Sequence, residues 1–114
     1  MSDPTCLFCR IVAGEIPAQL VAETPEALAF RDIAPKAPVH VLVIPRRHVA
    51  SLATAADAAE LGALTQLAAR VAAQEGVAET RYRVVTNVGA DGGQSVGHLH
   101  FHVLGGRALG WPPG

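Results

Sequence analysis

The sequence has no excess of charge of either sign, because nine lysine and arginine residues stand against ten acidic ones and give a formal net charge of −1. This balance argues against the basic surface that holds nucleic acid and against an electrostatic membrane contact. No apolar run is long enough to span a bilayer, and the first residues lack a charged segment followed by an apolar one. We therefore expect a cytoplasmic protein that binds neither nucleic acid nor membrane.

Cysteine is also scarce. The two cysteines, Cys6 and Cys9, stand so close together that a fold-stapling disulfide is not expected. At 114 residues and 50% hydrophobic content, the chain can bury one core without such staples. No internal repeat is present. We expect a single domain over residues 1–114.

Apolar and turn-forming residues follow one another in an order that predicts an α+β fold. A short helix capped by Asp3 or Thr5 would run through Val12 and end near Gly14. Runs rich in β-branched and aromatic residues, bounded by turn formers, predict five strands. These strands are expected at residues 20–23, 27–31, 39–44, 82–87 and 98–104.

The longest regular pattern predicts a second helix. Thr54 or Asp57 would cap it, and it would run to about Gln74 with Gly76 as its C-cap. Its apolar face would consist of Leu61, Leu64, Leu67 or Ala68, and Val71. This leucine stripe indicates core packing and no function.

Three histidines at alternate positions are the most informative feature of the sequence. In an extended strand, His98, His100 and His102 share one face, while Leu99 and Phe101 line the other. Imidazole titrates near neutral pH and can act as a nucleophile, a proton donor or a metal ligand. The pattern therefore favours a chemical surface over a merely solvated strand face.

A glycine-rich segment, residues 89–97, lies between the last two predicted strands. It could be a flexible connection, since glycine readily adopts positive φ. Its small residues could instead let backbone N–H groups approach an anion. It matches neither the P-loop nor the dinucleotide fingerprint. Its position directly before the histidines favours a role in the same site.

The same histidines admit two kinds of zinc site. Three imidazoles on one strand could hold a catalytic zinc with water as the fourth ligand. Alternatively, Cys6 and Cys9 have the spacing of half a tetrahedral site, which His48 and His98 could complete. The other two histidines of the strand would then stay available for chemistry, with His40 beside them. The cysteines could also be small, partly buried thiols without a metal.

These motifs together resemble the histidine triad (HIT) family, whose signature of alternating histidines followed by apolar residues matches residues 98–104. The chain is more closely similar to the Hint branch, the histidine triad nucleotide-binding proteins. That similarity covers nearly the whole chain. It includes residues 8–11, 15–17, 29–33, 37–45, 87, 91–96 and 104–107, and the terminal Trp-Pro-Pro-Gly at 111–114.

The resemblance implies an α+β fold with a five-stranded antiparallel sheet, one short helix and one long helix. It also implies a homodimer that pairs through the long helix and a sheet edge. The implied activity is that of a hydrolase that cleaves the P–N bond of purine nucleoside 5′-phosphoramidates, such as those of AMP, through a nucleotidyl-histidine intermediate. Two alternatives stay open: a nucleotide- or protein-binding module with incidental hydrolysis, and a dinucleoside polyphosphate hydrolase.

Carried over by position, the family's catalytic roles fall to three histidines. His100 would attack the α-phosphorus, and His102 would contact the phosphate and the leaving group. His40 would hydrogen-bond His100 and orient it, although a backbone carbonyl could also set the tautomer of that ring. The departing amine needs a proton, for which His102 and Ser95 are candidates.

The resemblance also implies the nucleotide contacts and the metal ligands. Asp32 would accept hydrogen bonds from the ribose hydroxyls. The base would lie between Phe8, Ile11 and Ile33, the phosphate and leaving side would be held by Asn87, Gly93 and Ser95, and Trp111 would reach the partner's active site. A structural zinc, held by Cys6, Cys9, His48 and His98, would join the first helix to the sheet. Catalysis itself would require no cofactor.

Overall fold

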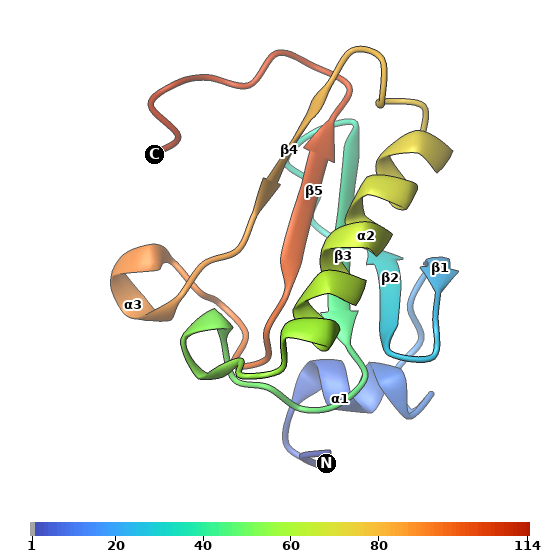
Figure 1. Ribbon diagram of the computed structural model, residues 1–114, viewed down its shortest axis with the longest axis vertical. Coiled ribbons are helices and arrows are strands. Elements are labelled where there is room, and N and C mark those ends of the chain that lie inside the picture. The colour runs from blue at the N-terminus through green and yellow to red at the C-terminus, as the bar shows by residue number, and fades with distance from the viewer. Residues whose placement is uncertain (1) are drawn as a thin grey trace.

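The computed structural model describes residues 2–114, and its centre is a five-stranded antiparallel sheet. The strands lie in the order β1-β2-β3-β5-β4 (Figure 1). In chain order the elements are α1 (Leu7–Val12), β1 (Leu20–Glu23), β2 (Ala27–Arg31), β3 (Val39–Pro45), the 3₁₀ turn η1 (Leu52–Thr54), α2 (Ala58–Gln74), β4 (Tyr82–Val85), α3 (Gly89–Gly92) and β5 (Phe101–Gly105). The predicted fold class is confirmed. None of the helices in residues 2–114 is long and apolar enough to cross a membrane.

The sheet separates two hydrophobic cores, and its central strand β3 contributes side chains to both. This strand pairs with β2 on one side and with β5 on the other, so both of its edges are hydrogen-bonded. Val41 and Val43 point into the larger core, and Leu42 and Ile44 point into a smaller core on the opposite face. The period of two in a strand produces this division.

Helix α2 covers one face of the sheet (Figure 1). Its N-cap is Asp57, whose carboxylate accepts hydrogen bonds from the backbone N–H groups of Ala59 and Glu60. The predicted apolar face is buried at Leu64, Leu67, Ala68 and Val71, and Leu61 is partly buried. Burial of each large aliphatic side chain contributes about 1.5–3 kcal/mol, which holds the helix on the sheet. The helix has Glu75 as its C-cap, and Gly76 follows with φ +78°.

Helix α1 belongs to the smaller core on the opposite face. Its Phe8 ring packs edge-on against Phe30 of β2, with centroids 5.5 Å apart. The cap predicted at Asp3 or Thr5 is wrong, because Cys6 is the N-cap and its sulfur accepts a hydrogen bond from the Cys9 N–H. The Asp3 carboxylate instead accepts hydrogen bonds from Thr5.

The histidine segment enters the sheet later than predicted. Strand β5 begins at Phe101 and not at His98, because the backbone before it bonds elsewhere. The Leu99 N–H donates to Val49 in the loop after β3, and the His100 carbonyl accepts from the Thr86 hydroxyl. Residues 98–103 still alternate in direction, since Leu99, Phe101 and Val103 all lie in the α2-side core.

Two neighbouring predictions also need correction. Strand β4 ends at Val85, two residues earlier than expected. The glycine-rich segment is not simply a loop, because Gly89–Gly92 form one helical turn. That turn ends at Gly93, whose φ of +83° is the left-handed conformation that glycine adopts without strain.

Candidate functional site

The five histidines lie in two clusters that meet at residues 98–102. The His100 and His102 rings meet edge to face with centroids 4.9 Å apart, and the His102 centroid lies 5.1 Å from that of His40 of β3. On the other side, His98 lies 5.1 Å from His48. Three elements supply these rings. His40 belongs to β3 and His48 to the loop after it, and the other three histidines belong to the start of β5 and the segment just before it.

Hydrogen bonds determine the tautomer of His40 and, through it, that of His102. The backbone N–H of Lys36 donates to His40 Nδ1 at 3.0 Å, so the proton of a neutral His40 ring is on Nε2. His40 Nε2 lies 2.9 Å from His102 Nδ1 and donates to it. The proton of His102 is therefore on its Nε2, for which no hydrogen-bond acceptor is found among residues 2–114.

His100 is oriented by the backbone and not by His40. Its Nδ1 lies 2.7 Å from the carbonyl oxygen of His98, which can only accept, so Nδ1 carries the proton. The predicted hydrogen bond from His40 to His100 is wrong, because the His40 ring meets His102 instead. In the neutral His100 ring, the lone pair is on Nε2, which has no protein partner in the described residues.

The site keeps two of these rings neutral at physiological pH. Burial lowers the pKa of His102 to about 4, with the neighbouring His100 and His40 adding to the effect and Asp32 opposing it. Burial also lowers the pKa of His40, against the attraction of Asp32. A neutral ring can be donor and acceptor at once, which the chain of hydrogen bonds from Lys36 to His102 requires.

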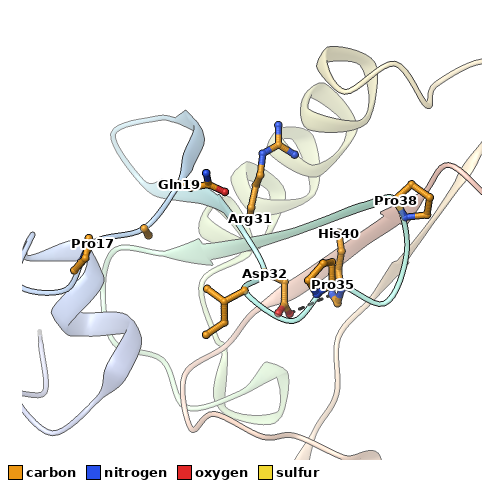
Figure 2. A pocket seen from close by; sticks show the side chains of 9 residues that line it. Pro17, Gln19, Arg31, Asp32, Pro35, Pro38 and His40 are labelled. Carbon is orange, nitrogen blue, oxygen red and sulfur yellow. Dashed lines mark ion pairs between the residues drawn. The ribbon is translucent and has the colours of Figure 1, made fainter.

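Asp32 lies directly after β2 and faces His40. Its Oδ2 is 3.4 Å from His40 Nε2, and Figure 2 shows this pair at the wall of a cavity of about 590 Å³. The shorter contact of His40 Nε2 is the one to His102 at 2.9 Å, so that contact is the hydrogen bond and Asp32 acts mainly through its charge. Oδ1 of Asp32 accepts from the Ala34 N–H and fixes the carboxylate in a turn.

An apolar cavity of about 260 Å³ adjoins the histidines on the α1 side. His100 and His102 form its polar end, and Asp32 lies on its wall. Its remaining lining is Leu7, Phe8, Ile11, Ile16, Pro17, Ala18, Phe30, Arg31, Ile33, Leu42, Ser95 and Val96. Ile33 is 100% exposed at this position, which is unusual for a large aliphatic side chain and fits one that a ligand covers.

A third cavity, of about 470 Å³, lies on the β4 side of the sheet; it shares His40 with the cavity of about 590 Å³ and His102 with the apolar cavity. We call it the β4-side cavity. It is lined by Lys36, His40, Arg83, Val85, Asn87, His102, Leu104, Pro113 and Gly114. His102 thus stands between two cavities, whereas His100 lines only the apolar one.

The second cluster consists of Cys6, Cys9, His48 and His98, whose ligand atoms all lie within 4.8 Å of one another. Cys9 Sγ is 3.2 Å from His48 Nδ1, and His98 Nδ1 is 3.4 Å from Cys6 Sγ and 3.6 Å from Cys9 Sγ. Zinc bonds of about 2.0–2.3 Å place tetrahedral ligands about 3.5 Å apart. These four residues could therefore hold a metal ion, and their donor set fits zinc.

A hydrogen bond to the backbone orients the His98 ring toward the two cysteine sulfurs. Its Nε2 lies 2.9 Å from the Pro45 carbonyl and donates to it, which leaves the Nδ1 lone pair facing the thiols. Burial lowers the pKa of His98, so this ring is neutral. Burial also raises the pKa of the Cys9 thiol, and a cation that binds there would displace its proton.

The structure brings most of the predicted nucleotide-binding residues together, but not all of them. Asp32, Ile33, Phe8, Ile11 and Ser95 line the apolar cavity, and Asn87 lines the β4-side cavity. Two predicted residues lie elsewhere: Gly93 ends α3, and Trp111 is 81% exposed with Arg83 5.9 Å from its ring centroid.

Two groups at the site had no recognised signal in the sequence. The Lys36 N–H that sets the His40 tautomer is a backbone donor, which any residue except proline offers. Arg83 of β4 reaches the C-terminal segment, where it donates to the Gly110 carbonyl at 2.7 Å. Its position on the histidine face could have been suspected only from the pairing of β4 with β5.

Comparisons with known proteins match the sequence and the fold of this chain. The family model described as HIT domain matches residues 13–109. A HIT-like protein of Synechococcus elongatus, itself uncharacterised, is 54% identical over 116 residues, covering 100% of both chains. The crystal structure of a HIT family hydrolase from Legionella pneumophila has a TM-score of 0.94 at 48% identity, covering 96% of this chain and 100% of that one. A histidine triad nucleotide-binding protein from Candida albicans has a TM-score of 0.84 at 33% identity, with 95% and 83% covered.

Proposed function

The chain belongs to the HIT domain family, and from this membership we propose that it is a single-domain hydrolase of the Hint branch that cleaves the P–N bond of adenosine 5′-phosphoramidates. One observation carries the proposal. His100 has its Nδ1 proton bound to a backbone carbonyl and its Nε2 lone pair free, beside an apolar cavity that also contains the His102 ring.

His100 would be the nucleophile. Its Nε2 lone pair attacks the α-phosphorus, and the P–N bond to the amine breaks as the new P–Nε2 bond forms. The His98 carbonyl stabilises the ring while it carries the developing positive charge, because Nδ1–H keeps donating to it at 2.7 Å. A water molecule then attacks phosphorus, which releases AMP and restores the free imidazole.

His102 would protonate the departing amine. Its Nε2–H is the donor that the protein leaves unused, and His40 holds Nδ1 so that this proton faces the ligand. An anionic phosphoramidate beside the ring opposes the burial that lowers its pKa, and Asp32 acts in the same direction. Bound substrate would thus favour a second proton on Nδ1, taken from solvent, and this imidazolium can give its Nε2 proton to the amine. In the second step, His102 takes the proton of the attacking water.

The apolar cavity would hold the purine nucleoside. Its aromatic and aliphatic walls suit a base, with Phe8 and Ile11 on one side and the exposed Ile33 on the other. Asp32 would accept hydrogen bonds from the ribose hydroxyls, since one of its oxygens is not used by the turn. Ser95 also lines the cavity and would contact the phosphate. Asn87 and Gly93, placed farther out, would serve the leaving side.

The Cys-His cluster would hold a structural zinc. Cys6 and Cys9 belong to α1, whereas His48 and His98 belong to loops at the end of the sheet, so one ion would tie these parts together. No catalytic step requires it. The zinc ion would contribute to catalysis only indirectly, because its ligand His98 also supplies the backbone carbonyl that orients His100.

We further propose that the chain forms a homodimer through α2 and the free edge of β4. In support, β4 pairs with only β5, and Val84 and Val88 beside that edge are 42% and 41% exposed. The exposed Trp111 would then reach toward the partner's active site. The proposed place of action is the cytoplasm.

Release of a fluorescent amine from its adenosine 5′-phosphoramidate tests the proposal. The wild-type protein should release the amine, and His100→Ala should bind AMP without doing so. A wild-type protein that binds AMP but turns over no phosphoramidate would refute the hydrolase and favour a nucleotide-binding module.

A further inference from the structure

We infer that the β4-side cavity receives the leaving group and selects amines that carry an anionic group. The inference rests on the proposed function, because it assigns the leaving-group side of that same site. It concerns specificity, which the three histidines do not determine. Its basis is the position of the cavity relative to His100 and His102, together with the charge of its walls.

The position follows from the geometry of displacement at phosphorus. The attacking and leaving atoms lie roughly in line on opposite sides of the phosphorus. His100 lines the apolar cavity and does not line the β4-side cavity, whereas His102 lines both. A phosphorus atom attacked by His100 and contacted by His102 would therefore expel its amine toward the β4-side cavity. With about 470 Å³, this cavity has room for a small amine such as an amino acid.

The charged side chains that line the cavity are all cationic, and the α-carboxylate of Gly114 is the acidic group beside them. Lys36 and Arg83 are among its lining residues, and none of the lining side chains is a carboxylate. The apolar cavity differs in this respect, since Asp32 lies on its wall next to Arg31. A leaving group on the β4 side thus meets two cations against one terminal carboxylate, and this excess of positive charge favours an anion.

Both cations are also free of ion pairs. Within residues 2–114, neither Lys36 nor Arg83 lies within ion-pair distance of a carboxylate, whereas Arg31 and Arg47 each pair with a glutamate. Lys36 Nζ donates only to the Ala34 carbonyl, at 2.7 Å. Cations beside a cavity can attract an anionic ligand more strongly when no carboxylate lies within ion-pair distance of them.

The C-terminal segment holds Arg83 in place. One guanidinium nitrogen donates to the Gly110 carbonyl at 2.7 Å, and the Trp111 ring lies 5.9 Å from the guanidinium carbon. Only one of the five N–H groups of Arg83 is used in this way, and the others can reach a ligand. A guanidinium with free N–H groups is suited to a planar carboxylate or to a phosphate group.

Three matched substrates test the inference. Adenosine 5′-phosphoramidates are prepared with 3-aminopropionate, 2-aminoethylphosphonate and 3-aminopropionamide, which share the same two-methylene spacer and differ in the group at the far end of the amine. The measured quantity is the ratio of kcat/KM for each anionic substrate to that for the neutral amide. Comparing this ratio between protein variants cancels the intrinsic reactivity of each amine.

The variants are Arg83→Gln and Lys36→Gln, with Arg70→Gln as the matched control. Arg70 is exposed on α2, on the other face of the sheet, and its replacement removes the same charge. We expect the anion-to-amide ratio to fall about fivefold in each cavity variant and to stay unchanged in the control, since a near-surface charge contact is worth about 1 kcal/mol. The larger of the two wild-type ratios tells whether the site prefers a carboxylate or a phosphorus-centred anion.

Equal ratios in all four proteins would overturn the inference, and so would a fall of the same size in Arg70→Gln. Rising ionic strength should lower the wild-type ratio, and a ratio insensitive to salt would count against it. The neutral amide separates this inference from the proposal beneath it. A wild-type protein that fails to release 3-aminopropionamide would refute the hydrolase itself, whereas release without anion preference would refute only the subsite.

Discussion

His98 and His100 are two residues apart and both are buried, yet the protein presents opposite nitrogens of the two rings. His98 Nε2–H donates a hydrogen bond to the Pro45 carbonyl, so the Nδ1 atom of His98 faces two thiols. His100 Nδ1–H donates a hydrogen bond to the His98 carbonyl, so the Nε2 atom of His100 is left for the apolar cavity. Each ring is therefore oriented by one backbone hydrogen bond, which places His98 in the Cys-His cluster and leaves His100 with a lone pair that can attack a ligand.

The comparison shows that residue type alone does not fix a histidine's role. The two rings share a strand-like segment, a low exposure and an aromatic neighbour, since Phe8 packs edge-on against both. What differs is the acceptor that each ring finds, and therefore the position of its lone pair. Replacing one ring at a time should therefore disturb the two roles independently.

The largest effect is expected from His100→Asn. The asparagine amide can still donate to the His98 carbonyl, but no second nitrogen remains to attack phosphorus. Phosphoramidase turnover should fall by at least about a thousandfold. The thermal midpoint should stay within a few degrees of the wild type. The matched His98→Asn protein should show the opposite pattern, with a clear loss of stability. Equal behaviour of the two variants in calorimetry and turnover would contradict the separation of roles.

Metal removal should affect the Cys-His cluster that contains His98, and thereby the stability of the fold. If the cluster holds zinc, binding free energy contributes to folding, and a strong chelator should lower the thermal midpoint by about 10 °C or more. Cys9→Ser should abolish most of this chelator effect. The experiment is a thermal melt with and without chelator, alongside metal analysis. A purified protein with no metal and no chelator response would refute the zinc proposal while leaving the His100 chemistry intact.

A smaller effect is expected from His40, which positions His102. His40→Leu removes the Nε2–H donor, and kcat should fall by about 10- to 100-fold. His40→Gln can place an amide N–H near the same position and should recover part of the loss. Side-chain ¹⁵N spectra should show His102 protonated on Nε2 in the wild type and in the glutamine variant. A mixed tautomer in the wild type would contradict the assignment.

The smallest effect concerns stability against pH. The pKa of His102 is about 4 in the folded protein, below the value of about 6.5 for an unfolded histidine. Between these values, the unfolded chain binds a proton that the folded protein does not, so the free energy of unfolding falls as pH drops from about 6.5 to about 4. The full difference corresponds to about 3 kcal/mol, and because the ring is only partly buried, solvent screening should reduce the contribution of His102 to about 1–2 kcal/mol. Denaturant titrations of wild type and His102→Gln should show a shallower dependence in the variant.

The strands and the long helix could be predicted from sequence because their signals are local. β-Branched runs and a leucine stripe need no information from distant residues. The start of β5 could not be predicted in this way. His98 and Leu99 have strand-like sequence, but Leu99 bonds to Val49, far along the chain. Such a competing partner is set by the tertiary fold and leaves no local pattern.

The partner of His40 shows the same limit within the site. That His40 joins the other histidines was expected, yet the ring it meets depends on the register of β3 against β5. Leu42 stands opposite His102 in that register, and His40 stands opposite Leu104. His40 is therefore the diagonal neighbour of His102 on the same face. A register is a non-local property, so the sequence left open whether His40 or a carbonyl orients His100.

The most direct test of the central claim is to locate the covalent intermediate. Wild-type protein is mixed with an adenosine phosphoramidate, quenched rapidly, and analysed by intact mass and peptide mapping under conditions that preserve phosphohistidine. The account predicts a single AMP adduct on Nε2 of His100, absent from the His100→Asn protein. An adduct on His98 or His102, or turnover without any adduct, would contradict it.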